Sequence, residues 1–269
     1  MALLPSNTGS MRHLAALGIF ALTWLSVSTS ALAQGPIAAT SFLLQNFERM
    51  VFDERLDPLP WSAFWRWREE VRAVIIGDKG MAYSKQVRHL FRDFEALTGV
   101  RFTLSESDSA ATLEIVFAAR DWYRNAAART FPEPEQVQCF ASTTKGHNGW
   151  IQSAYVVIPD DLSQRSVETC LAHELMHVLG FAGHPTRTFS SALRSKGRAS
   201  ETLTTNDLLL IRTFYDPTIT PAMGREDLMA AVRSIVTELR NEAGRSDDPM
   251  EVLTQRHPLQ LWWLDTAPV

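Results

Sequence analysis

The sequence of 269 residues has only two cysteines, no block of basic residues and, beyond its first 33 residues, no long apolar run. Nucleic-acid-binding chains cluster lysine and arginine between aromatic residues, whereas here both signs are interspersed at a formal net charge of -4. These features argue against a nucleic-acid partner. The sequence also contains no Gly-rich phosphate loop, no internal repeat and no low-complexity tract, so neither a nucleotide-binding fingerprint nor a repeat architecture is expected.

The first 33 residues have the pattern of a signal peptide, with Met11 as an alternative start. A short basic region at Met11-Arg12-His13 precedes an apolar stretch from Leu14 to Val27, and Ala31-Leu32-Ala33 forms a small-x-small cleavage site. The apolar stretch is about 14 residues long, short of the roughly 20 that a membrane span needs. No cysteine directly follows the cleavage site, which argues against a lipid anchor. We therefore predict a bacterial periplasmic or secreted chain without a transmembrane anchor.

The two cysteines gain meaning from this predicted export. Cys139 and Cys170 are the whole complement, and an even pair in an oxidising compartment favours a disulfide. Two buried free thiols are the alternative. A bond would tether the segment around Cys139 to the residues just before His173.

The five residues His173-Glu174-Leu175-Met176-His177 are the most informative stretch of the chain. A helix turns by about 100° per residue, so histidines four apart share a face and can both ligate one zinc ion. Glu174 flanks that face, where it can deprotonate a metal-bound water. The alternative is a partly buried helix with two satisfied histidines. Apolar neighbours favour a buried helix, and Gly180 is a natural stop.

The residues after the motif resemble the extended zinc signature of the metzincin peptidases. Gly180 follows the second histidine by three residues, and His184 then implies a third ligand. The family's third histidine falls six positions after the second, whereas His184 falls seven after His177, so the turn must accommodate one extra residue. Glu201 and Asp207 are alternative third ligands, and a surface histidine before a proline is the alternative reading of His184.

Residues 203–215 resemble the helix that follows the zinc loop in matrixin-type metzincins. They are more similar still to the core of an uncharacterised bacterial secreted family, in which such a stretch ends in Tyr-Asp-Pro, as at Tyr215, and continues into Pro-x-Met. This resemblance spans most of residues 65–245. Asp207 also fits a capping box, and Tyr215 is interpreted as a core residue. Metzincins place a methionine turn beneath the metal, but Met223 follows the helix and is interpreted as an apolar plug.

The order of expected elements indicates an α+β fold: a zincin or metzincin-like catalytic domain with a helix-backed mixed β-sheet, an HExxH active-site helix and C-terminal helices. Helical spacing and β-branched runs predict these elements. The expected helices cover 42–52, 84–97, the histidine-bearing segment, 206–214 and 226–240, and the expected strands cover 71–76, 100–104, 112–117, 137–142 and 151–158. The resemblance places the edge strand around 137–142. The predicted organisation is a signal peptide over 1–33, an N-terminal helix and linker over 34–60, the zincin-like domain over 61–245 and a C-terminal tail packed on the domain over 246–269.

These features favour an exported zinc-dependent hydrolase, a metallo-endopeptidase, in which His173, His177 and His184 hold Zn²⁺ and Glu174 is the catalytic base. The expected partner is a peptide or protein substrate. Two alternatives stay open. One is a zinc amidase acting on cell-wall peptides. The other is a non-catalytic envelope or binding domain, which the displaced third histidine and the missing methionine turn favour.

Overall fold

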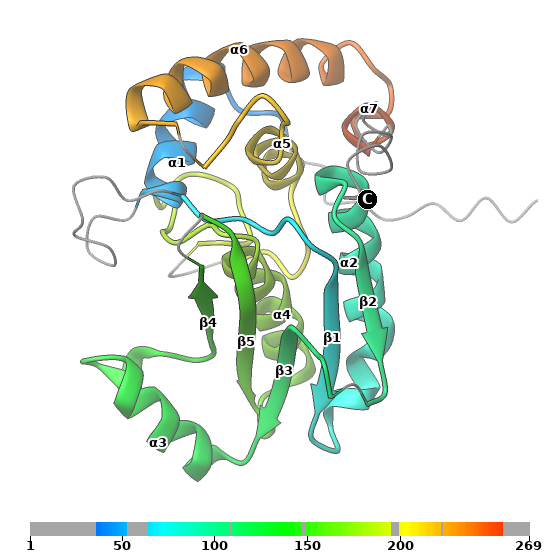
Figure 1. The fold of residues 1–269 in the computed structure, drawn as a ribbon, viewed down its shortest axis with the longest axis vertical. Helices are drawn as coiled ribbons and strands as arrows, with labels where there is room; N and C mark the ends of the chain where they lie inside the picture. Colours follow the sequence, from blue (N-terminus) through cyan, green and yellow to red (C-terminus); the bar gives the residue numbers. More distant parts are fainter. Residues whose placement is uncertain are drawn as a thin grey trace, which may run out of the picture. The chain divides into compact units, whose positions relative to one another are not determined.

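A mixed sheet of five strands occupies the centre of the fold (Figure 1), with strand order β2-β1-β3-β5-β4. The computed structural model describes residues 36–52, 64–107, 109–146, 149–194, 199–221 and 223–254, and all of them belong to one compact unit. Four strands run parallel and β4 pairs antiparallel with β5. The strands are β1 (Val71–Ile76), β2 (Phe102–Ser105), β3 (Leu113–Ala118), β4 (Phe140–Lys145) and β5 (Ile151–Pro159).

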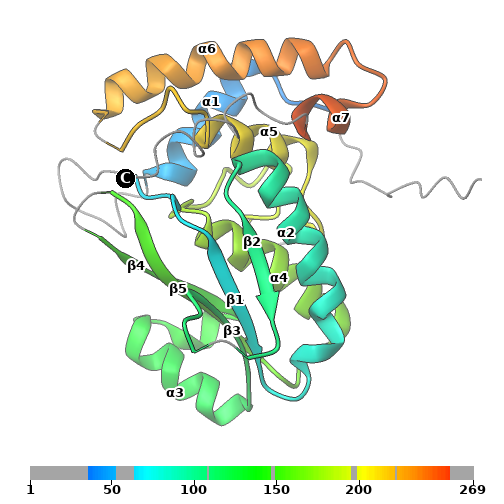
Figure 2. The same ribbon diagram turned by 45° about the vertical axis from the view of Figure 1, so that its right-hand side comes forward.

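Helices cover both faces of this sheet, because alternate side chains of each strand point to opposite sides. Helices α2 (Ser84–Thr98) and α4 (Gln164–Val178) lie on one face, and α3 (Arg120–Thr130) lies on the other (Figure 2). Ile115 and Val156 face the main apolar core, whereas Val116 and Val157, their neighbours in sequence, pack in a second cluster with α3. The predicted mixed α and β architecture with a helix-backed sheet is therefore confirmed.

Helix α3 was not among the elements expected from the sequence, which placed four strands in succession before the histidine-bearing helix. The segment is too polar to display a clear apolar stripe, since only Tyr123 and Ala127 are buried along its eleven residues. These two residues are four apart and lie on one face of the helix. Tertiary packing against the sheet, rather than a strong sequence pattern, stabilises this helix.

The edge strand begins three residues later than expected. Residues 137–142 were predicted as the strand, but β4 begins at Phe140. Val137 instead receives a hydrogen bond at its carbonyl from the Tyr123 hydroxyl, at 2.8 Å, so this residue pairs with α3 and not with the sheet. The expected place of the strand at the sheet edge is correct.

The remaining helices gather at one end of the sheet (Figure 1). Helix α1 is Thr40–Val51, α5 is Thr205–Phe214, α6 is Arg225–Ala243 and α7 is Pro249–Thr254, and short 3-10 helices η1 and η2 span Gly80–Tyr83 and Pro134–Gln136. Helix α1 contacts α5 and α6, and its apolar side chains join the main core. Helix α7 occupies part of the segment expected to be a tail.

Several predictions fall outside the described residues. These are the signal peptide over 1–33, the linker over 53–60 and the part of the tail beyond Thr254. The proposed division between residues 34–60 and 61–245 stays a prediction. Within the described part of the chain, none of the helices combines the length and apolar character that crossing a membrane requires.

Candidate metal centre

Helix α4 carries the first two histidines of the motif and ends directly after them. Its N-cap is Ser163, whose hydroxyl accepts a hydrogen bond from the Ser166 N–H. At its other end Gly180 has a φ of 109°, and a Cβ there would lie 1.9 Å from the carbonyl oxygen of Trp65. Only glycine fits this turn, which sends the chain back towards the helix and brings His184 within reach of His173.

Buried side chains hold the last carbonyls of α4. The Trp67 indole donates to the Val178 carbonyl and the Tyr215 hydroxyl donates to the Leu179 carbonyl, both at 2.8 Å. These bonds satisfy groups that a helix end leaves without intrahelical partners. Tyr215 is a buried core residue, as predicted, and burial raises its pKa.

The three predicted histidines converge on one point. The Nε2 atom of His173 lies 3.2 Å from the Nε2 atoms of both His177 and His184. Two of the rings are oriented by backbone oxygens: the Nδ1 atoms of His173 and His177 lie 2.8 Å from the Ala192 carbonyl and 2.5 Å from the Phe181 carbonyl. A carbonyl oxygen can only accept, so each of these Nδ1 atoms carries the proton and the Nε2 atoms are left to bind a cation.

The two Nε2 separations from His173 match those expected of a zinc site. Zinc–nitrogen bonds of about 2.0–2.1 Å in a tetrahedron separate the nitrogens by about 3.3 Å, close to the observed 3.2 Å. Among the described residues, these three histidines form the one cluster of at least three potential metal ligands. Three imidazoles also form a ligand set well suited to zinc.

The short Nε2–Nε2 distances are not explained by a proton between the rings, because burial lowers the pKa values of His173 and His177. Burial, followed by the neighbouring His184, lowers the pKa of His173 to about 4. Burial also places the pKa of His177 well below 6.5, with smaller contributions from the other two rings. At neutral pH both rings are therefore neutral, and their Nε2 lone pairs face each other. A bound cation would turn this repulsive arrangement into a favourable one.

Glu174 lies beneath the edge strand and is only 3% exposed. Burial raises its pKa to about 8, and a hydrogen bond from the Ala141 backbone of β4 opposes that shift. Without a cation nearby, the buried group therefore holds its proton at neutral pH. A carboxyl with a pKa in this range can act as a proton carrier.

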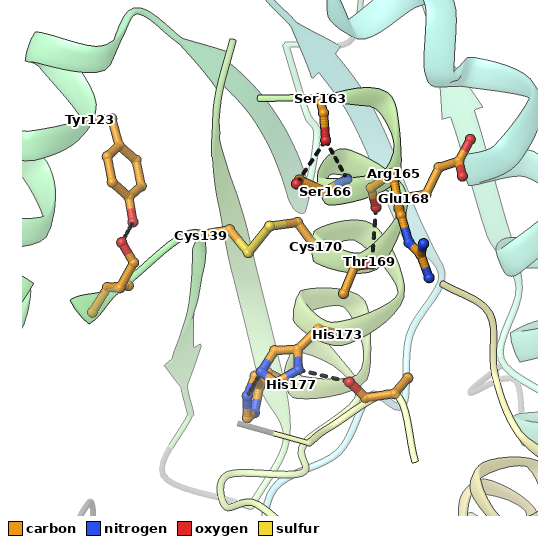
Figure 3. Close-up of a disulfide and its surroundings, with 12 residues drawn as sticks. Tyr123, Cys139, Ser163, Arg165, Ser166, Glu168, Thr169, Cys170, His173 and His177 are labelled. Carbon is orange, nitrogen blue, oxygen red and sulfur yellow. Dashed lines mark hydrogen bonds between the residues drawn. A yellow bond between two sulfur atoms is a disulfide. The ribbon is translucent and has the colours of Figure 1, made fainter. Parts of the chain in front are cut away.

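Tyr123 of α3 interacts electrostatically with Glu174, an interaction that the sequence did not predict. Burial, together with the Glu174 carboxyl, raises the pKa of Tyr123 to about 12. Its hydroxyl donates to the Val137 carbonyl, so the phenol fixes the chain just before β4 (Figure 3). This residue carried little recognisable signal, because the segment of α3 was not expected to be helical.

The predicted disulfide is confirmed. Cys139 and Cys170 are bonded and join the residue before β4 to the middle of α4 (Figure 3). Cys170 precedes His173 by one helical turn. The bond therefore ties the edge strand to the helix that carries two of the three histidines.

Asp207, an alternative third ligand, has a different role in the structure. It forms the predicted capping box of α5 with Thr204. Its carboxylate also accepts hydrogen bonds from the Ser191 hydroxyl and the Ala192 N–H. Because the Ala192 carbonyl orients His173, Asp207 supports the ring indirectly.

The other candidates also lie outside the cluster. Glu201 forms an ion pair with Arg165, with 2.6 Å between the carboxylate oxygen and Nε. Met223 is partly buried against the core just before α6, as expected of an apolar plug. The turn at Ser191-Ala192, which contacts His173, contains no methionine and carried no recognisable sequence signal.

Comparisons with known proteins place the chain in a family but assign it no activity. A search of curated proteins found no match. A family described as "Protein of unknown function (DUF2927)" matches residues 40–234. The match covers α1, the sheet, the histidines and about half of α6. On this evidence the chain belongs to that uncharacterised family, in agreement with the second resemblance noted in its sequence.

Proposed function

We propose that this protein is an exported zinc-dependent hydrolase, a metallo-endopeptidase, on a zincin-like fold. The convergence of the Nε2 atoms of His173, His177 and His184 carries this proposal. These three residues would hold the zinc ion. Zinc, when bound, acts as a Lewis acid that polarises a carbonyl and lowers the pKa of a coordinated water towards about 7.

Glu174 is the proton carrier in this proposal. A cation held by the histidines favours the ionised carboxylate, because a nearby opposite charge lowers the pKa of an acid. The Glu174 carboxylate takes the proton of the attacking water and then delivers it to the nitrogen of the leaving amine. The Ala141 N–H orients the carboxylate during both transfers.

The substrate proposed for this site is an extended peptide. Strand β4 is an edge strand of the sheet, and an edge has unpaired backbone groups to which a peptide can add as a further strand. Ala141 of β4 hydrogen-bonds Glu174, so a peptide along this edge would pass close to the carboxyl.

Two variants separate metal binding from catalysis. Glu174→Gln should retain zinc and lose peptide cleavage, because the amide cannot accept the water's proton. His173→Ala should lose both, because it removes a ligand. Elemental analysis of the purified mature protein and cleavage of an unfolded protein substrate measure the two properties. A wild-type rate in Glu174→Gln would reject the mechanism.

A non-catalytic metal domain is the second candidate. The observation that favours it is the turn at Ser191-Ala192, which contacts His173 but contains no methionine. Stoichiometric zinc without cleavage of protein or cell-wall peptide substrates would favour this candidate. Cleavage of cell-wall peptides alone would instead identify an amidase.

A further inference from the structure

His184 lies on a segment that helix α1 holds at two points. On one side of the histidine, the Gly183 N–H donates to the Met50 carbonyl of α1 at 2.8 Å. On the other side, the Thr186 N–H and hydroxyl both donate to Oδ1 of Asn46, at 2.7 and 3.0 Å. The contacts therefore bracket the third histidine, and both come from a helix more than 130 residues earlier in the chain.

The position of Asn46 in α1 allows this contact. It is fully buried on the otherwise apolar face of the helix. Its amide nitrogen donates to the Phe42 carbonyl at 2.7 Å, which directs Oδ1 towards Thr186. A buried amide without such partners would destabilise the fold, so the side chain is satisfied only when the His184 segment is in place.

Other features of the segment increase its dependence on α1. Pro185, directly after the histidine, has no N–H to donate, so Thr186 supplies the nearest backbone donor on that side. The Phe42 ring packs edge-on against Phe189, with centroids 5.5 Å apart. By contrast, the backbone of the first two histidines belongs to α4, and the carbonyls of Ala192 and Phe181 orient their rings.

We infer that Asn46 is a positioning residue of the metal centre, which holds His184 at coordinating distance through Thr186. The inference rests on the proposed zinc site and adds α1 to it. Helix α1 thus positions the third ligand, although it lies far from the HExxH motif in sequence. Removing the Asn46 acceptor oxygen should make the His184 segment more mobile and weaken the bond between His184 and the metal.

The test compares zinc affinity among variants of the full mature chain. Asn46→Leu keeps the approximate volume but removes the acceptor. Asn46→Asp keeps an acceptor oxygen at the same position, and because burial favours the protonated acid, its O–H can replace the donor to the Phe42 carbonyl. Val87→Ala, on α2 and fully buried, is the control for general loss of packing. Zinc affinity is measured by competition with a chelator, and the absorption spectrum of the cobalt-substituted protein reports the number of ligands.

We expect zinc binding in Asn46→Leu to be weaker by about tenfold or more, as for other residues that orient metal ligands. Its cobalt spectrum should change, whereas Asn46→Asp and Val87→Ala should retain the wild-type spectrum and nearly its affinity. Unchanged affinity and spectrum in Asn46→Leu would overturn the inference while leaving the proposed function intact. A wild-type protein that binds no zinc would overturn both.

Thr186→Val provides a milder test in case Asn46→Leu does not fold. It removes only the hydroxyl donor and retains the N–H bond to Asn46. A severalfold loss of zinc affinity beyond that of Val87→Ala supports the inference. Equal affinity in these two variants overturns it.

Discussion

Glu174 is the residue whose chemistry depends most on what the histidines hold. Burial raises its pKa from an ordinary value of 4.5 to about 8 in the metal-free protein. The folded state then keeps a proton that the unfolded chain releases above pH 4.5. By linkage, the stability that this proton provides is fully present below pH 4.5 and is lost as the pH rises towards 8.

Replacing this acid by a neutral amide should therefore change the pH dependence of stability. In the metal-free protein, the free energy of unfolding of Glu174→Gln relative to wild type should increase by a few kcal/mol between pH 4.5 and 8. The histidines titrate in both proteins, so their contribution cancels in the difference. Urea unfolding at pH 5 and pH 8 in the presence of a chelator measures it. A difference that is independent of pH would show that the Glu174 pKa is not raised.

For single residues, the sequence predicted the three clustered histidines better than the groups that orient them. The four-residue spacing of His173 and His177 follows from helix geometry alone. In contrast, the Ala192 carbonyl contacts His173, and the Asn46 side chain contacts Thr186 next to the His184 segment, only through tertiary structure. A backbone oxygen carries no residue-specific signal. Asn46 did carry such a signal, because a polar residue on an apolar helix face indicates a buried hydrogen-bond partner.

Among the elements, β4 and α4 are joined covalently as well as by packing. The Cys139–Cys170 bond closes a loop with a sequence separation of 31. A loop of that length stabilises the folded state by about 3–4 kcal/mol through its effect on the unfolded chain. The bond also lies one turn from His173, at the start of the strand that covers Glu174.

Removing the bond should lower stability by that amount. The Cys139→Ala, Cys170→Ala double variant is expected to unfold at a lower urea concentration, with a free energy of unfolding about 3–4 kcal/mol smaller. Wild-type protein unfolded with a reductant present is the control and should behave alike. A mass increase of two daltons on reduction verifies the bond beforehand. Identical unfolding midpoints for the variant and the oxidised wild type would contradict the expectation.

Strong periodicity explains which elements the sequence predicted. The strand over 71–76 and the helix beginning at Ser84 match the structure closely, because alternation and helical spacing of apolar residues were clear there. Helix α3 was missed because its buried face consists of only two residues. Strand β4 was placed early because Val137 is apolar but pairs with Tyr123 instead of β5.

Across the fold, three helices from separate parts of the chain, α1, α4 and α5, contribute to holding the histidines. Helix α4 supplies His173 and His177, the segment that supplies His184 is held by α1, and the turn at Ala192 is held by Asp207 at the start of α5. An ion bound by all three histidines would therefore connect parts that otherwise separate on unfolding. Binding to the folded state alone stabilises a protein by mass action.

Zinc should consequently raise the thermal stability of the mature chain. A zinc concentration of about a thousand times the Kd contributes about 4 kcal/mol, which corresponds to a rise in Tm of roughly 10 °C for a chain of this size. Differential scanning calorimetry of chelator-treated protein with and without zinc measures the shift. Magnesium is the control ion, because it prefers oxygen ligands and should leave Tm unchanged.

His184→Ala removes one of the three proposed ligands, so the rise in its Tm with zinc should be much smaller. An equal rise in wild type and His184→Ala would mean that the ion binds elsewhere, because only a site that includes His184 depends on that ring.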